Sequence, residues 1–200
     1  MSAFDQHALS TLLEQQRYEE VAPQLDEEEV KSATQDTLSG NWPVVIHLLG
    51  HLYNGRLSDA RFLWKRIPDQ RKSQDEELAV ALRLLQMMWN KEYQGVWQVL
   101  ALPSWAPQSQ PLVKALTSRI RSHNLQLVTR SYTTISAPKL AMMLGIPQAE
   151  VAQVAHKEGW TMDPNTGLCQ VKPPQVPDQE RANLKHLENL TEYLMHLERA

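Results

Sequence analysis

Apolar residues in the first half of the chain recur with the spacing of paired amphipathic helices. After each of three short polar turns, apolar positions fall at i, i+3 and i+7, which places them on one face of a helix. The helices that follow these turns are predicted to begin at Tyr18, Leu57 and Tyr93. These starts lie 39 and 36 residues apart (57 − 18 and 93 − 57). The pattern therefore predicts stacked helical hairpins, similar to tetratricopeptide repeats, that bury one another's apolar faces.

The stretch between the first and second hairpins, residues 23–40, has no such pattern. It contains the acidic run Asp26-Glu27-Glu28-Glu29 and many Ser, Thr and Gln residues. Short acidic runs usually lie in solvent. We expect a solvated loop or a frayed helix here, and an interaction tail is the alternative.

Residues 111–172 follow a different order of elements. A long helix over about 112–132 is followed by an extended segment, a short helix over 138–144 and a helix over 148–158. Two alternating segments, 160–162 and 168–171, then flank a turn-rich tip and predict a strand pair. Helix, strand, helix, helix and hairpin is the order of a winged helix.

The end of the chain combines a stiff linker with an amphipathic helix. Residues 172–177 (KPPQVP) predict an extended linker, and a helix is expected over about 178–199. Leucines on this helix are spaced by 3, 3, 4 and 3 positions, close to a heptad seam, and form the candidate partner-binding site: Leu184, Leu187, Leu190, Leu194 and Leu197. The spacing alone leaves open whether this seam packs on its own chain or joins the helices of a partner.

Together these patterns predict an all-α fold with a small β wing. We expect helical-hairpin repeats over residues 1–110, a winged-helix subdomain over 111–172, and a tether with a closing helix over 173–200. The 200 residues include 20 Lys and Arg against 23 Asp and Glu, a formal charge of −3. A nucleic-acid-binding domain is normally basic, so this balance argues against one.

The sequence has no feature typical of a secreted or membrane-spanning protein. A single cysteine, Cys169, cannot close an intrachain disulfide. The longest apolar stretch, residues 44–53, is about half the length of a membrane span. The first residues do not form a secretion signal. We therefore expect a soluble intracellular protein that does not bind membranes.

Two histidines are the main candidates for metal chemistry. His47 and His51 lie at i and i+4 on a predicted helix, the spacing of a two-histidine metal site. The segment HLLGH lacks the glutamate of the hydrolytic motif HExxH, and no downstream cluster supplies a third ligand. We expect these histidines to line a helix–helix contact, with a histidine-metal hydrolase as the alternative.

Other catalytic and cofactor chemistry has weaker support in the sequence. The closest two glycines, Gly50 and Gly55, are five positions apart, so the dinucleotide fingerprint GxGxxG is absent. Cys169 lies in a predicted wing strand with no cation beside it to activate the thiol. We predict no catalytic residue, no cofactor site and no metal site.

A winged helix also suggests DNA binding. Its third helix would contact bases, and the end of that helix carries one lysine, Lys157, beside Glu158. Phosphate contacts require several Arg or Lys residues, so protein docking is the favoured use of this subdomain, with a DNA-binding regulator as the alternative.

Helical hairpins that lead into a winged helix resemble the PCI family, named for the proteasome lid, the signalosome and a translation initiation factor. Residues 58–68 (SDARFLWKRIP) closely resemble the subunit-eight family of the constitutive-photomorphogenesis-nine (COP nine) signalosome. Asn41–Pro43 together with Ile46–Gly50 and Tyr53 resembles the plant members in particular. Further similar segments are Leu144–Pro147, Glu158–Trp160 and Leu190–Glu198. The resemblance covers about residues 40–198 in order.

This resemblance implies a non-catalytic scaffold subunit of the complex that removes Nedd8 from cullin–RING ubiquitin ligases. It implies a hetero-oligomer in which winged helices adjoin and C-terminal helices gather in a bundle, with signalosome subunit three as the expected neighbour. Location in cytoplasm and nucleus, and repression of photomorphogenesis in plants, are implied with it. The equivalent small subunit of the proteasome lid or of the initiation factor is the alternative within the family.

Overall fold

The predicted hairpins form in the computed structural model, which describes residues 6–32, 42–163, 166–172, 185–192 and 194–195. The helix pairs are α1 (Gln6–Glu14) with α2 (Tyr18–Ser32), α3 (Val44–Tyr53) with α4 (Leu57–Arg66), and α6 (Glu76–Asn90) with α7 (Tyr93–Leu100). The second helix of each pair begins at the residue predicted from the sequence. A short helix that the sequence pattern did not predict, α5 (Asp69–Gln74), lies between α4 and α6 and has no buried residue.

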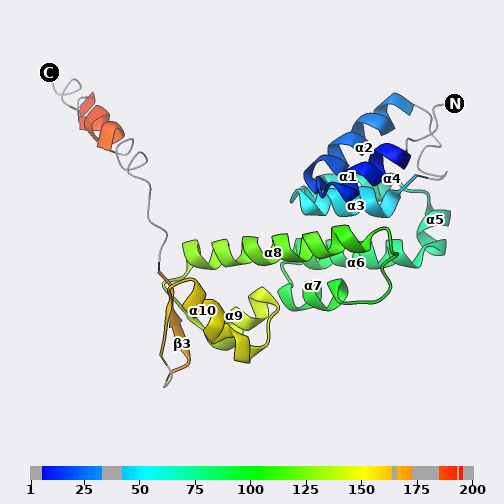
Figure 1. Ribbon diagram of the computed structural model, residues 1–200. Helices are drawn as coiled ribbons and strands as arrows, with labels where there is room; N and C mark the ends of the chain where they lie inside the picture. Colours follow the sequence, from blue (N-terminus) through cyan, green and yellow to red (C-terminus); the bar gives the residue numbers. More distant parts are fainter. Residues whose placement is uncertain (1–5, 33–41, 164–165, 173–184, 193, 196–200) are drawn as a thin grey trace.

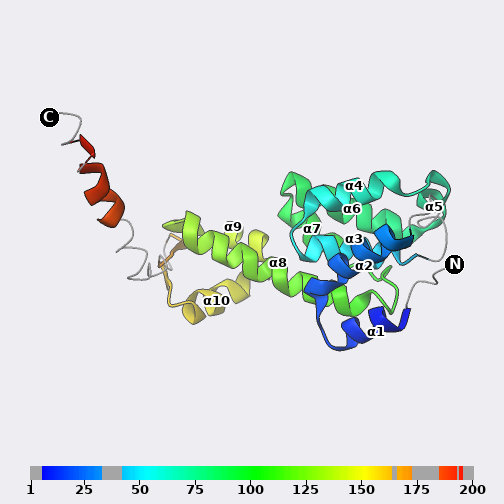
Figure 2. The ribbon, with the colours of Figure 1, turned by 90° about the horizontal axis from the view of Figure 1, so that it is seen from above.

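Helix α3 is the centre of the hairpin stack. Its residues from Val44 to Leu52 are all buried, including the two polar ones, His47 and His51. It packs against α2, α4, α6 and the long helix α8 (Gln110–Ser131), so neighbouring hairpins share one core. Figures 1 and 2 show α8 running along this stack and on to the second, smaller part of the molecule.

The acidic stretch after the first hairpin is more ordered than the sequence indicated. Helix α2 continues through Pro23 to Ser32, while residues 33–41 lie outside the described part of the chain. A proline inside a helix removes the N–H that would bond the carbonyl four residues earlier, here that of Glu19. The Nδ2 group of Asn54, in the turn between α3 and α4, donates to this carbonyl oxygen at 2.9 Å. A side chain from the next hairpin thus replaces the bond that Pro23 removes.

A close approach of α2 to α3 depends on Gly50. A Cβ atom at this position would lie 3.1 Å from the backbone nitrogen of Ala22 and 3.2 Å from its Cβ. Both contacts are tight, so the two helices can come this near only because Gly50 has no side chain. This glycine serves helix packing and not a phosphate loop.

The winged helix forms as predicted after α8. Its elements are β1 (Thr134–Ser136), α9 (Ala137–Leu144), a short 3-10 turn (Gln148–Glu150), α10 (Val151–Lys157), β2 (Thr161–Met162) and β3 (Leu168–Gln170). The strands form an antiparallel sheet in the order β1-β3-β2, with Ile135 opposite Cys169 and Met162 beside it. Helix α8 contributes Leu116 to the core of the hairpins and Val128 to the core of the winged helix. The observed elements confirm an all-α fold with a small β wing.

Residues 185–192 and 194–195 are helical, within the range predicted for the closing helix. Figure 1 shows this segment apart from the hairpin stack and the winged helix. Among the described residues, no helix has both the length and the apolar character needed to cross a membrane.

Candidate functional site

The leucine face predicted as a partner-binding site is exposed where the structure describes it. Leu187, Leu190 and Leu194 are 61%, 54% and 61% exposed. Their spacing of three and four residues places them on one side of the helix. Leu184 and Leu197, the other two members of the predicted set, lie outside the described residues.

This exposed face is energetically costly to leave in water. Burying one leucine side chain completely stabilises a structure by about 1.5–3 kcal/mol. Met195 is 57% exposed beside the same leucines. A contiguous apolar stripe of this kind is typical of a surface that another chain segment covers.

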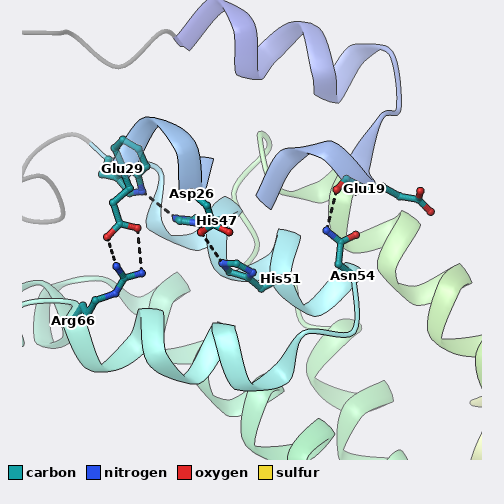
Figure 3. Close-up of polar contacts among 8 residues, drawn as sticks. Glu19, Asp26, Glu29, His47, His51, Asn54 and Arg66 are labelled. Atoms are coloured by element: carbon teal, nitrogen blue, oxygen red, sulfur yellow. Dashed lines mark hydrogen bonds and ion pairs between the residues drawn. The ribbon is translucent and has the colours of Figure 1, made fainter. Parts of the chain in front are cut away.

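The predicted histidine pair lies at the contact between α2 and α3, as Figure 3 shows. His47 and His51 are buried, and their rings are stacked with centroids 4.8 Å apart. The Oδ1 atom of Asp26, on α2, lies 2.9 Å from Nε2 of His47 and 3.3 Å from Nε2 of His51. These contacts, together with the pair between Glu29 and Arg66 at 2.7 Å, hold α2 against α3 and α4.

The hydrogen bonds determine which nitrogen of His47 carries the proton. The indole Nε1–H of Trp42 donates to Nδ1 of His47 at 3.3 Å. In a neutral imidazole whose Nδ1 accepts, Nε2 bears the hydrogen, so Nε2 donates to the carboxylate of Asp26. Nδ1 of His51, by contrast, is buried and has no hydrogen-bond partner among the described residues.

Asp26, His47 and His51 have possible metal-ligand atoms within 4.8 Å of one another. Whether they suit a metal ion depends on which ring nitrogens carry hydrogens. A metal-binding histidine normally donates its second ring N–H to an acceptor, which leaves the first nitrogen free for the metal. Trp42 imposes the opposite tautomer on His47, and no acceptor within the described chain faces Nδ1 of His51. This hydrogen-bond arrangement favours a polar clamp between two helices over a metal centre.

Burial and charge shift the pKa values of two members of this clamp. Burial lowers the pKa of His51 most, the nearby His47 lowers it further, and Asp26 opposes the shift. Partial burial raises the pKa of Asp26, but the hydrogen bond from His47 and the charges of His51, His47 and Arg66 outweigh it. The net result for Asp26 is a pKa below its usual value.

The junction between the hairpin stack and the winged helix depends on the C-terminal end of α9. The last carbonyls of a helix have no partner within it. The indole Nε1 of Trp97 donates to the Met142 carbonyl at 3.0 Å, Nδ2 of Asn124 to that of Met143 at 2.7 Å, and Nε of Arg121 to that of Leu144 at 3.0 Å. Side chains of α7 and α8 thus cap α9 and fix the winged helix to the stack.

These junction contacts also bear on the DNA-binding alternative. Two of the arginines on the long helix are already engaged: Arg121 contacts α9, and Arg119 pairs with Glu19 at 2.7 Å and lies over the ring of Tyr53. The exposed end of α10 carries Lys157 beside Glu158. The helix that would contact bases therefore offers one lysine beside a carboxylate, whereas phosphate contacts require several cations.

A groove of about 490 Å³ lies between the turns of the second and third hairpins and α8. We call it the α8 groove. Its lining includes the apolar side chains of Leu57, Met88, Val96, Leu116, Ile120 and Leu127. Lys91, Arg119 and His123 also line it, and no carboxylate does.

Sequence reasoning did not identify Asp26, the capping residues of α9 or the α8 groove. The acidic run around Asp26 predicts solvent exposure, but Asp26 lies on a helix that buries Val21, Ala22 and Leu25. The lining of the groove comes from residues more than sixty positions apart in the sequence. They come together only when the hairpins stack, so no local sequence pattern marks the groove.

Comparison with known proteins places most of the chain within one family. The sequence profile of the CSN8/PSMD8/EIF3K family matches residues 38–180. The chain is 33% identical over 158 residues to the COP9 signalosome complex subunit 8 of Arabidopsis thaliana, covering 79% of this chain and 80% of that protein. The protein of the same name from Danio rerio is 32% identical over 155 residues, covering 76% and 80%. That from Dictyostelium discoideum is 20% identical over 193 residues, covering 96% and 97%.

Proposed function

This chain belongs to the CSN8/PSMD8/EIF3K family, and we propose that it is a non-catalytic scaffold subunit of the COP9 signalosome. In that role it acts through protein–protein contacts within the complex that removes Nedd8 from cullin–RING ubiquitin ligases. The family alone does not separate this role from the proteasome lid or the initiation factor, because its description spans all three. The observation that carries the proposal is the 33% identity to a signalosome subunit over four fifths of both chains.

The structure supports a role in assembly through its exposed leucine face. Leu187, Leu190 and Leu194 form an exposed apolar stripe on the helical segment that Figure 1 shows apart from the stack. In a bundle of partner helices the same leucines would be buried, as at a heptad seam. Signalosome subunit three is the neighbour we propose for this helix and for the winged helix, and cytoplasm and nucleus are the compartments we propose.

The rival functions have less support from the side-chain chemistry. A metal-dependent hydrolase would require the imidazole tautomer that Trp42 disfavours at His47. A DNA-binding regulator would require several cations along α10, where Lys157 lies beside Glu158, and Arg119 and Arg121 of α8 are engaged within the chain.

Affinity purification with a tag on this chain tests the proposal. We expect signalosome subunits to copurify, including subunit three, and the triple variant Leu187→Glu, Leu190→Glu, Leu194→Glu to lose most of them. A matched control, Lys185→Glu with Asn189→Glu, changes the net charge by the same −3 on the opposite face of the helix. We expect the control to copurify normally.

Two outcomes would overturn the proposal. Recovery of proteasome lid or initiation-factor subunits in place of signalosome subunits would assign the chain to another branch of its family. Equal loss of partners in the leucine variant and in the charge-matched control would remove the specific role of the leucine face.

A further inference from the structure

Within the described part of the chain, an apolar helix face and an apolar groove suit each other in size and character. One is the leucine face at Leu187, Leu190 and Leu194, which is more than half exposed. The other is the α8 groove, whose apolar lining includes the 36% exposed Leu127. We propose that in the free subunit the C-terminal helix docks its leucine face into the α8 groove of its own chain.

The shape and apolar character of the groove suit an amphipathic helix. Its volume of about 490 Å³ falls within the range of pockets that bury most of a ligand. Helices bind such grooves through anchors at i, i+3 and i+7. Leu187, Leu190 and Leu194 have this spacing.

The charges of the helix do not hinder this docking. At 100° per residue, Glu188 and Glu192 lie on the side of the helix away from the leucines, so their carboxylates stay in solvent when the leucine face is docked. The α8 groove presents the ammonium of Lys91, the guanidinium of Arg119 and the imidazole of His123 in its lining. The lysine of the described helix, Lys185, also lies on the side away from the leucines, so it does not face these cations.

The tether is long enough for this docking within one chain. The backbone N–H of Val171 donates to the carbonyl of Thr133 at 2.9 Å, so the chain leaves the wing beside the end of α8. Leu127, at the near end of the groove, precedes Thr133 by four helical and two extended residues, a path of about 13 Å. The segment 173–184 can span up to about 40 Å.

The same tether favours docking within the chain over docking between chains. A second binding surface on a short linker experiences an effective concentration of about millimolar. A separate copy of the chain would have to reach that concentration in solution to compete.

Docking of this kind would protect the subunit before assembly. An exposed apolar stripe promotes aggregation, and the groove would cover it until partner helices displace it. This consequence rests on the proposed assembly role of the helix, whereas the docking itself does not.

Paramagnetic labelling of the full chain tests the docking. A nitroxide on Asn189→Cys would lie on the helix face opposite the leucines. The native Cys169 is fully buried, and burial raises the pKa of its thiol, so the label goes to the introduced thiol. We expect the methyl signals of Leu57, Met88, Ile120 and Leu127 to lose intensity several-fold. Adding Leu187→Glu and Leu190→Glu to the labelled chain should restore the signals.

Three results would overturn the inference. Undiminished groove signals in the labelled chain would mean that the helix does not dock. Broadening that persists in the leucine variant would show that the helix lies near the α8 groove without using its leucine face. Broadening that appears only when labelled and unlabelled chains are mixed would assign the groove to a second copy.

A groove variant keeps this test separate from that of the assembly role. Leu127→Glu places a charge at an already exposed groove position and leaves the leucine face intact. We expect it to abolish the broadening while signalosome subunits still copurify. Broadening that persists in Leu127→Glu would count against the docking alone, whereas failure of the unsubstituted chain to copurify signalosome subunits would count against the assembly role alone.

Discussion

Replacing Gly145 by alanine tests the junction between the hairpin stack and the winged helix. Gly145 follows α9 with φ of +62°, a left-handed conformation. A Cβ atom there would overlap Cδ2 of Trp97 and lie 2.5 Å from Cγ and 2.6 Å from Cε2 of the same ring. These are atoms of a rigid ring whose Nε1 is bonded to the Met142 carbonyl. The added methyl group therefore cannot fit without movement of α9 or of Trp97.

The expected cost has two parts, and a matched glycine separates them. A left-handed conformation costs a residue with a Cβ about 1–2 kcal/mol, and overpacking adds about 1–3 kcal/mol. Gly159 has φ of +71°, and a Cβ there would meet nothing within 4 Å. Gly159→Ala should therefore cost about 1–2 kcal/mol, and Gly145→Ala about 2–5 kcal/mol.

Urea unfolding followed by circular dichroism measures both variants, and a double-mutant cycle identifies the cause. In a Trp97→Ala background, the cost of Gly145→Ala should fall to that of Gly159→Ala, since the ring that it would strike is absent. Equal costs for Gly145→Ala and Gly159→Ala in the native background would refute the close packing of α9 on Trp97.

Three further predictions concern the contact between α2 and α3. Asn54→Ala should lower the free energy of unfolding by about 0.5–1.5 kcal/mol. In a Pro23→Ala background the loss should be smaller, because the backbone N–H of the new alanine can bond the Glu19 carbonyl within the helix. Equal losses in both backgrounds would contradict the pairing of Asn54 with that carbonyl. The pKa of His51 is lower in the folded chain than its unfolded value of about 6.5, so the unfolded chain binds more protons at acidic pH. The free energy of unfolding should therefore fall as the pH drops below about 6.5. His51→Gln should flatten that dependence between pH 7.5 and 5.5 in urea titrations, and an unchanged slope would assign it to other groups. Added zinc should leave the melting temperature unchanged, whereas stoichiometric zinc that is lost in His47→Ala would establish a metal site.

The sequence predicted the helical hairpins well because their turns are short and polar. Tyr18, Leu57 and Tyr93 begin helices whose apolar residues repeat on one face, and each follows a turn that breaks the apolar pattern. Local patterns of this kind survive in the folded chain because stacking buries the same face that the spacing defines.

Two local features were not predictable by the same rules. Helix α5 spans the polar residues 69–74 and buries none of them, so it has no apolar pattern to detect. Helix α2 contains Pro23, which normally ends a helix, and its continuation depends on contacts of the next hairpin with Glu19 and Asp26.

The candidate site was predictable only where it lies on one helix. Leu187, Leu190 and Leu194 share a face because of their spacing, and the structure places all three in solvent. The α8 groove joins residues of separate hairpins and α8, such as Leu57, Met88 and Ile120, so no local pattern marks it. The tautomer of His47 likewise depends on the position of Trp42 in the folded chain.

Native mass spectrometry of the complex that this chain enters tests the central claim most directly. The account predicts one copy of the chain in an assembly with other signalosome subunits, and loss of that copy when Leu187, Leu190 and Leu194 are replaced by glutamate. An assembly of proteasome lid or initiation-factor subunits, or a complex that retains the glutamate variant at full occupancy, would contradict it.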